Sequence, residues 1–408
     1  MANRFVVLPL LLVSLTAISQ VNTYNEVNLP QLMQKVKTSN YAANPSSSHM
    51  LVLDVRTPGE YMDTVPGGRH IGIGRIKGAM NISLQDLFNK PDAIKKLDGY
   101  KDKEVYVICS HSYRSRRVSN LLLENGFKKV NNVQGGMTEW YRNYDVLKSY
   151  LGDFENNIGY HNMSPAELFH KLNAKEPLLL IGFTNPPRFF FDSLIAPLYP
   201  VFPDFNNVTY YKPADSLKIL EEAKSANGKA IVLFNTIGGG ASDVAELLAR
   251  NGIPNVHNLV GNIPGFFEYL ENFQSQKVAA TMLKPQSQIR FYTPLSFCRQ
   301  VPRNMQWVDL RHDTTFNKIT KGTKLDYKTL KGAINFPFYK TADEFEQQFP
   351  DKNKLYVIIP ENGYTGVELV TALINKGYRF GWLLSGIERW EWYANNIPEF
   401  TCKDQLVQ

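Results

Sequence analysis

Three stretches of the chain repeat one pattern, and this repeat constrains the fold more than any other feature. Each stretch begins with a short apolar run rich in β-formers, passes through a polar loop into an amphipathic helix, and ends at Asn-Gly or Lys-Gly. The closing glycines, Gly126, Gly252 and Gly377, suit the left-handed backbone that ends a helix. The stretches occupy residues 106–127, 230–253 and 355–378. This regularity predicts tandem copies of one supersecondary unit.

Each copy extends in both directions. A helical stretch and an apolar strand precede it, and a second strand with a glycine turn follows it. The helical stretches are 29–37, 165–172 and 294–301, the earlier strands 51–56, 178–183 and 307–311, and the later strands with their turns 130–136, 256–261 and 380–386. Strands that alternate with helices indicate α/β units on a parallel sheet. We expect three domains of one fold, at 22–148, 160–275 and 285–402, each a mostly parallel central sheet flanked by helices.

Composition excludes several classes of protein. The 408 residues are 43% hydrophobic and 20% charged, which is ordinary for a globular chain and predicts two to four domains. The net charge of +7 is dispersed, so we expect no nucleic-acid partner. Three cysteines cannot form a disulfide scaffold, and no Cys or His pair has metal-ligand spacing. We therefore expect no metal and no organic cofactor.

The N-terminus reads as a secretory signal peptide over residues 1–19. Arg4 precedes an apolar run, Phe5–Ile18, that is too short for a membrane span, and Ala17 and Ser19 suit cleavage after Ser19. A buried first helix is the alternative, but Pro9 interrupts it. No other segment is long and apolar enough to cross a bilayer. We expect an exported protein, periplasmic or secreted and of bacterial type, with no membrane span in the mature chain.

The residues with chemical potential lie in the first copy. Cys109 ends an apolar strand and opens the loop Cys109–Arg114, directly before a helix. Backbone N–H groups and the helix N-terminus favour a thiolate there and can hold an oxyanion. Arg114 adds a planar fork of donors for sulfonate-type or carboxylate-type oxygens. The pattern predicts a nucleophile, and a buried structural cysteine is the alternative.

The first domain resembles the rhodanese-like sulfurtransferase family. The matching motifs are LDVRTPGEY at 53–61, GRIKGAMNI at 74–82, the Cys109–Arg114 loop and VQGGMTEW at 133–140. Four residues separate Cys109 from Arg114, one fewer than in the cysteine phosphatases of this fold, so the loop suits sulfane sulfur more than phosphate. Ser112 stands where the family often has glycine, which puts the loop dihedrals and the donor preference in question.

The resemblance implies a role for each residue of the site. Cys109 would be the catalytic nucleophile, and Asp54 and Arg56 would support the loop. The residues expected to bind substrate are Ser110, His111, Ser112, Tyr113, Arg114 and Ser115. The aligned positions are Asn235 and Gly240 in the second copy and Pro360 and Thr365 in the third. Neither Asn nor Pro can carry a persulfide, so these domains resemble inactive rhodanese copies.

We expect an exported sulfurtransferase that moves sulfane sulfur from a thiosulfate-type donor to a thiol or cyanide acceptor through a Cys109 persulfide. A non-catalytic scaffold of rhodanese modules and a thiol redox sensor are the alternatives. Cys298 and Cys402 flank the third domain and are candidates for a disulfide. The aromatic segment 186–205 is either a docking surface for a partner protein or local core.

Overall fold

The computed structural model describes residues 23–64, 72–183, 200–203, 206–207, 216–235, 240–274, 278, 281–285, 287–317, 328–360, 365–384 and 386–407. The expected signal peptide at 1–19 and most of segment 186–205, predicted to be either a docking surface or local core, lie outside these residues, so both remain predictions.

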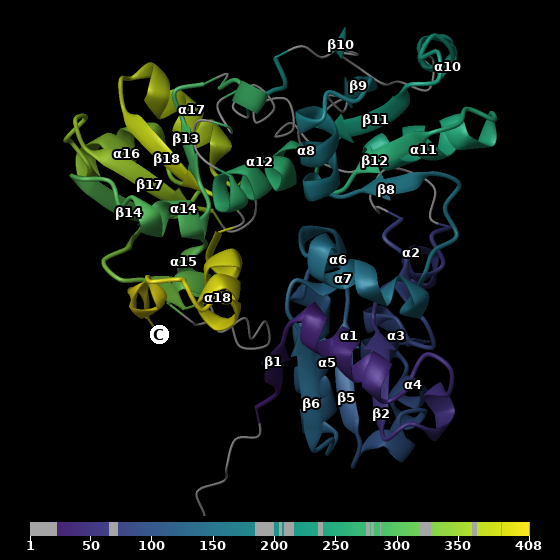
Figure 1. The fold of residues 1–408 in the computed structure, drawn as a ribbon. Coiled ribbons are helices and arrows are strands. Elements are labelled where there is room, and N and C mark those ends of the chain that lie inside the picture. Colours follow the sequence, from purple (N-terminus) through teal and green to yellow (C-terminus); the bar gives the residue numbers. More distant parts are fainter. Residues whose placement is uncertain are drawn as a thin grey trace, which may run out of the picture.

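The described strands form three five-stranded sheets in which every neighbouring pair is parallel (Figure 1). In spatial order, the first sheet contains β1 (Asn25–Val27), β6 (Lys129–Val133), β5 (Glu104–Ile108), β2 (Met50–Asp54) and β4 (Met80–Asn81). The second contains β10 (Asn206–Asn207), β9 (Leu178–Phe183), β11 (Ala230–Asn235), β12 (Val256–Leu259) and β8 (His161–Met163). The third contains β13 (Arg290–Tyr292), β18 (Arg379–Leu383), β17 (Leu355–Ile359), β14 (Met305–Asp309) and β16 (Ile334–Asn335). The expected α/β fold class is confirmed.

Helices cover the sheets. Those of the first unit are α1 (Leu29–Thr38), α2 (Pro58–Tyr61), α3 (Leu84–Asn89), α4 (Pro91–Lys95), α5 (Tyr113–Glu124), α6 (Glu139–Arg142) and α7 (Tyr144–Leu147). Those of the second are α8 (Pro165–Asn173), α10 (Ser216–Lys224), α11 (Gly240–Arg250) and α12 (Asn262–Phe273). Those of the third are α14 (Pro294–Arg299), α15 (Asp313–Phe316), α16 (Ala342–Gln348), α17 (Val367–Asn375) and α18 (Gly386–Asn396).

Each unit opens with an edge strand that leads into a capped helix. The caps are Asn28, Ser164 and Thr293, whose side chains accept a hydrogen bond from a first-turn amide, and each helix has proline in its first turn. Side-chain caps satisfy amides that the helix itself leaves unpaired, and proline fits the first turn because it needs no donor there. One residue, the cap itself, separates each of the edge strands β1, β8 and β13 from its helix, and these strands were not anticipated from the sequence.

Two short antiparallel pairs tie the chain beyond the expected ends of the first and third units. Strand β7 (Phe154–Glu155) pairs with β3 (Arg75–Ile76), and β19 (Leu406–Val407) pairs with β15 (Thr329–Leu330). Residues past 148 and past 402 therefore pack back onto the unit that they follow.

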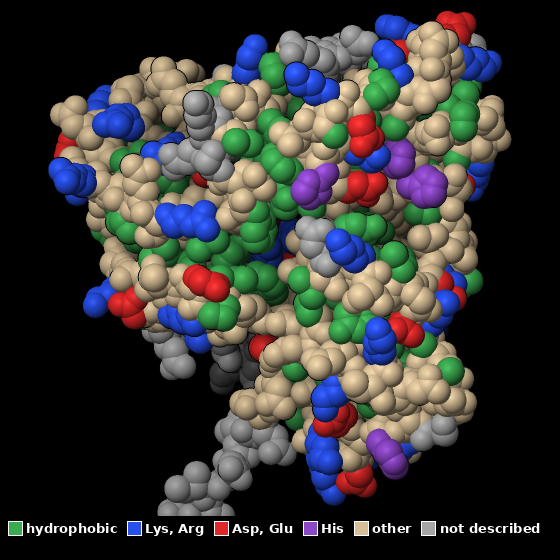
Figure 2. All heavy atoms as spheres, in the orientation of Figure 1, with side chains coloured by type: hydrophobic (Ala, Val, Ile, Leu, Met, Phe, Trp, Pro, Cys, Tyr) green, Lys and Arg blue, Asp and Glu red, His purple; other side chains and the backbone are tan. Residues whose placement is uncertain are grey.

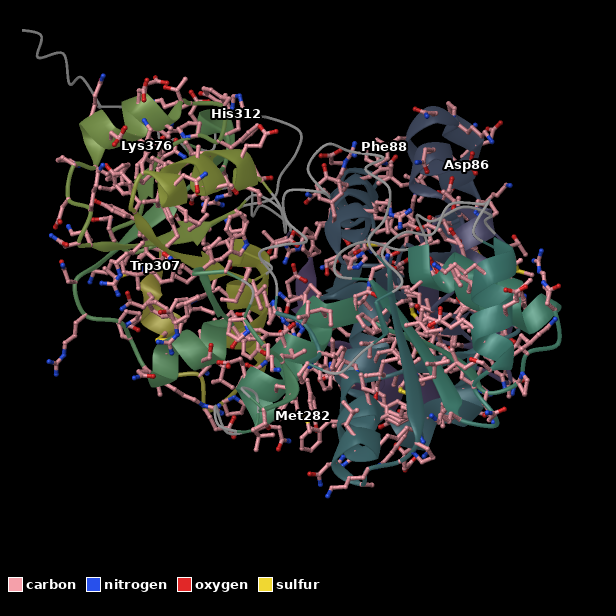
Figure 3. The ribbon with its side chains drawn as sticks, turned by 90° about the horizontal axis from the view of Figure 1, so that it is seen from above. Asp86, Phe88, Met282, Trp307, His312 and Lys376 are labelled. Carbon is pink, nitrogen blue, oxygen red and sulfur yellow. A yellow bond between two sulfur atoms is a disulfide. The ribbon has the colours of Figure 1, made fainter. Side chains whose placement is uncertain are left out.

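The units share packed surfaces. One hydrophobic cluster contains Phe266 and Leu270 of α12 together with Phe291 and Trp382 of the third sheet. Within the third unit, Trp307 of β14, which Figure 3 labels, packs edge-on against Trp390 of α18. Hydrophobic side chains also gather in the hollow between the third unit and the other two (Figure 2). Burial of apolar area across these contacts stabilises the arrangement of the three units.

Cys298 and Cys402 form a disulfide, with their Cα atoms 5.9 Å apart. The pairing that the sequence left open is therefore present, and it joins α14 to the C-terminal end of the third unit. Among the described residues, no helix has the length and apolar character needed to cross a membrane. The same residues contain no group of three or more His, Cys, Asp or Glu side chains arranged to hold a metal ion.

Candidate active site

Cys109 lies at the carboxyl end of β5, in the four-residue turn that leads into α5. Its side chain is buried, and its Sγ atom lies 3.6 Å from the hydroxyl of Ser115 in the first turn of that helix. The Ser115 hydroxyl in turn donates to the carbonyl of Ser112 at 3.0 Å. The Cys109 thiol thus donates to the Ser115 hydroxyl, and that hydroxyl can stabilise a thiolate or persulfide when its proton turns from the Ser112 carbonyl to the sulfur. Ser115 thus contacts the nucleophile rather than solvent.

The loop amides have no internal acceptor. In the described part of the chain, the backbone nitrogens of residues 110–115 donate no hydrogen bond to the protein. Amides at the start of a helix are unpaired by geometry, and they concentrate positive potential at that end. The loop therefore offers an anionic sulfur both free donors and a favourable field, as the sequence predicted.

Ser112 adopts the left-handed backbone conformation, with φ 76°, that the family usually assigns to glycine at this position. Its side chain is buried and compensates for that strained conformation. The hydroxyl donates to the carbonyl of Val133 at 3.1 Å and accepts from the amide of Gly135 at 2.6 Å. The departure from glycine therefore leaves the loop turn in place. The Ser112 hydroxyl is thus bonded within the protein, and the expected role of Ser112 in substrate binding stays a prediction.

The turn that follows β6 is hydrogen-bonded to the backbone of the Cys109 loop. The amide of Met137 donates to the carbonyl of Cys109 at 2.8 Å, and Thr138 donates to the carbonyl of Ser110 from both its amide and its hydroxyl. Gly136 passes so close that a Cβ atom would stand 2.3 Å from the Cys109 carbonyl oxygen. Only glycine allows this approach together with its φ of 59°.

Arg114 is paired inside the protein, which differs from the expected free fork of donors. Its two terminal nitrogens bond both oxygens of the Glu60 carboxylate at 2.6 and 2.7 Å, and one of them also donates to the Ser110 hydroxyl at 3.0 Å. Glu60 is buried, while Arg114 is partly exposed. The carboxylate neutralises most of the charge that an anionic donor would meet.

Sequence reasoning missed Glu60 as a site residue. The signal was present, because Thr57 and Glu60 form a capping box at the start of α2, within the motif at 53–61. This box fixes the carboxylate, which then reaches Arg114 across the sheet edge. The pairing depends on two segments that lie 54 residues apart in the chain.

Asp54 and Arg56 form a buried ion pair at the end of β2. Arg56 also donates to the carbonyl of Gly74 at 2.8 Å, and Asn81 donates to the carbonyls of both residues at 2.9 Å. These bonds fix the strand end beside the Cys109 loop rather than the loop itself. The third unit repeats the arrangement with Asp309, Arg311 and Asn335, joined by hydrogen bonds of 2.9 to 3.0 Å.

His111 and Tyr113 lie on the open side of the loop. Tyr113 is 42% exposed at the first position of α5. His111 is also open to solvent, but it sits at a recess between the first and third units. The surrounding protein, together with the guanidinium groups of Arg142 and Arg114, lowers the pKa of His111 to about 4. The lowered pKa favours the neutral imidazole at pH 7 over an ion pair with a thiolate.

The matching positions in the other units hold no sulfur. Asn235 ends β11, and its side-chain oxygen accepts from the amide of Ala241 in α11 at 2.6 Å. The side chain itself thus occupies the acceptor position at that helix start. Pro360 follows β17, and a Cβ on Gly386 would stand 2.7 Å from its carbonyl oxygen. This close approach matches that of Gly136 to Cys109 and supports the alignment of Pro360 with Cys109.

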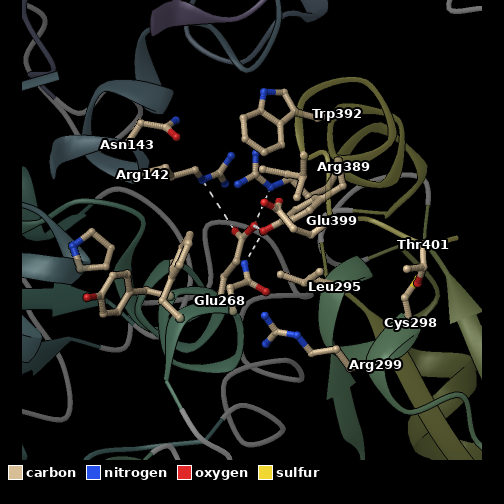
Figure 4. A pocket seen from close by; sticks show the side chains of 17 residues that line it. Arg142, Asn143, Glu268, Leu295, Cys298, Arg299, Arg389, Trp392, Glu399 and Thr401 are labelled. Atoms are coloured by element: carbon tan, nitrogen blue, oxygen red, sulfur yellow. Dashed lines mark hydrogen bonds and ion pairs between the residues drawn. The ribbon is translucent and has the colours of Figure 1, made fainter. Parts of the chain in front are cut away.

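A cavity of about 420 Å³ opens where the three units meet (Figure 4). At its floor Arg389 of α18 bonds Glu268 of α12 at 2.5 Å and Glu139 of α6 at 3.0 Å, and its guanidinium lies 4.2 Å from the ring of Trp392. Burial alone would raise the pKa of Glu268, but Arg389 and Arg142 hold it below its usual value. One buried guanidinium therefore joins all three units.

Residues 37–143 match the family model described as the rhodanese-like domain. The first unit is therefore a member of the rhodanese-like domain family. With its three parallel sheets flanked by helices, the chain as a whole is an α/β protein built of three units whose sheets share one strand order.

Similar proteins cover only parts of this chain. It is 29% identical over 105 residues to a tRNA uridine(34) hydroxylase of Cytophaga hutchinsonii, across 26% of this chain and 30% of that protein. It is 29% identical over 126 residues to the adenylyltransferase and sulfurtransferase UBA4 of Meyerozyma guilliermondii, across 30% and 27%. A crystal structure of thiosulfate sulfurtransferase from Pseudomonas aeruginosa is 13% identical, with a TM-score of 0.22, across 88% of this chain and 66% of that one. The chain thus spans less than a third of the length of these two curated relatives.

Proposed function

We propose that the protein is an exported sulfurtransferase of the rhodanese type, with Cys109 as its nucleophile and one active domain in three. One observation carries the proposal: a cysteine at a strand-to-helix turn is followed by six consecutive amides, of residues 110–115, that donate to no acceptor among the described residues. Such a cradle stabilises a negatively charged sulfur, which is the state needed for attack and for storage as a persulfide.

The reaction has two displacement steps. The Cys109 thiolate attacks the outer sulfur of a thiosulfate-type donor, a new S–S bond forms, and the S–S bond of the donor breaks. The departing sulfite keeps the bonding electron pair. In the second step the acceptor, cyanide or a thiolate, attacks the outer sulfur of the persulfide, and the Cys109 thiolate leaves. No net oxidant is needed, and the kinetics are ping-pong.

In the proposed reaction, the residues around Cys109 have separate roles. Ser115 places its hydroxyl beside the sulfur, the Gly136–Thr138 turn holds the loop carbonyls, and the Arg114–Glu60 pair forms one side of the loop. Asp54 and Arg56 hold the neighbouring strand end. The absence of sulfur at Asn235 and Pro360 supports the proposal that the second and third units are not catalytic.

Export is part of the proposal. The N-terminal pattern at 1–19 supports it, and so does the Cys298–Cys402 disulfide, because disulfides persist in oxidising compartments. Cys109 is then the free thiol of the chain, consistent with a functional role.

The test combines intact mass and turnover. The protein is incubated with thiosulfate, and its mass is measured before and after cyanide is added. We expect wild type to gain one sulfur, about 32 Da, and to lose it as thiocyanate, whereas Cys109→Ser gains nothing. If several sulfane donors give neither a sulfur adduct on Cys109 nor thiocyanate, the hypothesis of a non-catalytic scaffold is favoured instead.

A further inference from the structure

Helix α18 of the third unit lies against the part of the first unit that carries the Cys109 loop. The two face each other across a recess of about 100 Å³, which is lined by His111 and Ser112 of the loop and by Arg389 and Trp392 of α18. The recess therefore borders the Cys109 site itself. A unit with no cysteine at its own aligned position thus forms one wall of the space beside the nucleophile loop.

The first contact is an ion pair between Arg389 and Glu139 of α6. Their side chains are 8% and 0% exposed, and Nη1 of Arg389 donates to Oε1 of Glu139 at 3.0 Å. Nε of Arg389 donates to Oε1 of Glu268 in the second unit at 2.5 Å, which fixes the guanidinium from the other end (Figure 4). Arg142 bonds Glu139 from within the first unit at 2.8 Å. Water screens such buried charges only weakly, so the pair strongly restrains Glu139.

Glu139 is packed against the turn that is bonded to the Cys109 loop. A Cβ on Gly135 would stand 2.2 Å from Cγ of Glu139, so this side chain lies directly on the glycine. The amide of Gly135 donates to the Ser112 hydroxyl at 2.6 Å. Further along the turn, the amide of Met137 donates to the carbonyl of Cys109 at 2.8 Å. A shift of Glu139 would therefore move groups that are bonded to the loop at two places.

A second contact reaches the residue before that glycine. The side-chain nitrogen of Asn396, the last residue of α18, donates to the side-chain oxygen of Gln134 at 2.8 Å. The side-chain nitrogen of Asn28 donates to Asn396 at 2.9 Å, and the backbone amide of Gln134 donates to the carbonyl of Val27 at 2.8 Å. The turn is thus bonded both to β1 of its own sheet and to α18 of the third unit.

A third contact reaches α5, the helix that follows the loop. Arg116 lies near the start of α5, and its amide donates to the carbonyl of Ser112 at 3.0 Å. Its guanidinium is 3.3 Å from Glu391 and 3.6 Å from Glu388, both of α18, and 3.1 Å from Glu26 of β1. Helix α18 therefore contacts both segments that shape the Cys109 loop, the turn after β6 and the beginning of α5.

We propose that Arg389 and Asn396 are positioning residues for Cys109, which hold the turn at 134–138 and, through it, the amide cradle of the loop. Amides stabilise a developing charge most when they are aimed at it before the reaction, so a looser loop should react more slowly. The described hydrogen bonds of Arg389 go to carboxylates and not to the loop, so its effect passes through Glu139. The inference rests on the proposed function, since the reaction concerned is persulfide formation at Cys109.

Hydrogen exchange measures the restraint on the turn without any sulfur chemistry. Arg389→Lys keeps the charge but loses the planar fork, so the two bonds of the guanidinium cannot both keep their geometry. By mass spectrometry, we expect the amides at 134–138 to exchange at least about fivefold faster than in wild type, because a bond that holds the turn is weakened. Arg311→Lys is the matched control: Arg311 is also buried, but it is paired with Asp309 within the third unit, so the turn should exchange as in wild type.

Persulfide formation tests the consequence for Cys109. After addition of thiosulfate, we expect the mass gain of about 32 Da to be roughly tenfold slower in Arg389→Lys than in wild type or Arg311→Lys. Glu139→Gln should slow this step as well. The double variant with Arg389→Lys should be no slower than the slower single variant, because both changes break the same connection. Two independent structural defects would instead multiply their effects on the rate.

Asn396→Ala is the second variant, and it decides the question if Arg389→Lys does not fold. It removes the donor to Gln134 at a half-buried position, so the turn should exchange about threefold faster or more. A wild type that forms no persulfide would refute the proposed function, while exchange of the turn would still decide whether α18 holds it. The inference is overturned if neither folded variant exchanges faster at the turn than wild type, or if wild type forms the persulfide and both variants form it equally fast.

Discussion

The Glu60–Arg114 pair provides the sharpest test of how the site is built. Glu60→Gln keeps the shape of the side chain and one acceptor oxygen, but removes the charge that Arg114 now bonds at 2.6 and 2.7 Å. The Glu60 side chain is 3% exposed and that of Arg114 is 22% exposed, so solvent replaces the lost interaction only in part. Charge-assisted bidentate bonds are stronger than neutral ones, and we expect a loss of about 2 kcal/mol in the stability of the first unit.

The same change should improve use of an anionic donor. With Glu60 neutral, the Arg114 charge is no longer cancelled inside the protein. We expect the KM for thiosulfate to fall by roughly threefold, equivalent to about 0.7 kcal/mol of added binding. Opposite effects on stability and donor binding would be difficult to obtain from a nonspecific defect.

Scanning calorimetry and steady-state thiocyanate production measure the two effects. A loss of about 2 kcal/mol lowers the transition of a unit of this size by roughly 4–8 °C. Glu344→Gln is the matched control, because Glu344 forms the same kind of capping box with Thr341 at the start of α16 but is exposed and has no arginine partner there. If Glu60→Gln and Glu344→Gln melt alike and the thiosulfate KM is unchanged, the pair does not restrain Arg114 as argued.

Three further predictions follow from the geometry. Gly136→Ala places a Cβ 2.3 Å from the Cys109 carbonyl oxygen, and we expect persulfide formation, measured by mass spectrometry, to slow about 100-fold. Gly99→Ala is the control and should react as wild type does, because no atom lies within 4 Å of its added Cβ. The pKa of His111 is about 4 in the folded protein against a usual 6.5, so on acidification the unfolded chain binds a proton before the folded protein does. The stability of the folded protein should therefore fall as the pH drops from 6.5 towards 4. In calorimetric melts, His111→Asn should reduce that fall. The Cys298–Cys402 disulfide closes a separation of 104 residues, so the double serine variant should lose about 4–5 kcal/mol in the third unit, and an equal calorimetric transition in both proteins would contradict this.

Local signals allowed much of the fold to be predicted. The helices at 29–38 and 165–173 and the strand at 178–183 appear close to their expected bounds, because caps, proline positions and apolar runs act over a few residues. The three edge strands β1, β8 and β13 were missed because three paired residues leave no periodic pattern. Their pairing partners, such as β6 for β1, lie about a hundred residues away.

The candidate site, like the fold, could be predicted from the sequence only in part. The position of Cys109 between a strand and a helix, and hence the amide cradle, follows from the sequence alone because adjacent residues create it. The pairing of Arg114 with Glu60 and the hydroxyl bridge of Ser112 do not, because each joins segments that only packing brings together. The sequence does not show whether the guanidinium of Arg114 bonds a substrate or a buried carboxylate of the protein.

The sequence by itself determined the threefold repeat, the α/β class and the place of the single free cysteine, since these depend on neighbouring residues and on the period of apolar positions. The tertiary structure decided the disulfide, the partner of Arg114 and the contacts of α18 with the Cys109 loop region. Arg389 bonds Glu139 across 250 residues, and Asn396 bonds Gln134 across 262. Contacts over such separations exist only once three folded units have packed, because burial then fixes side chains that the isolated segments leave free.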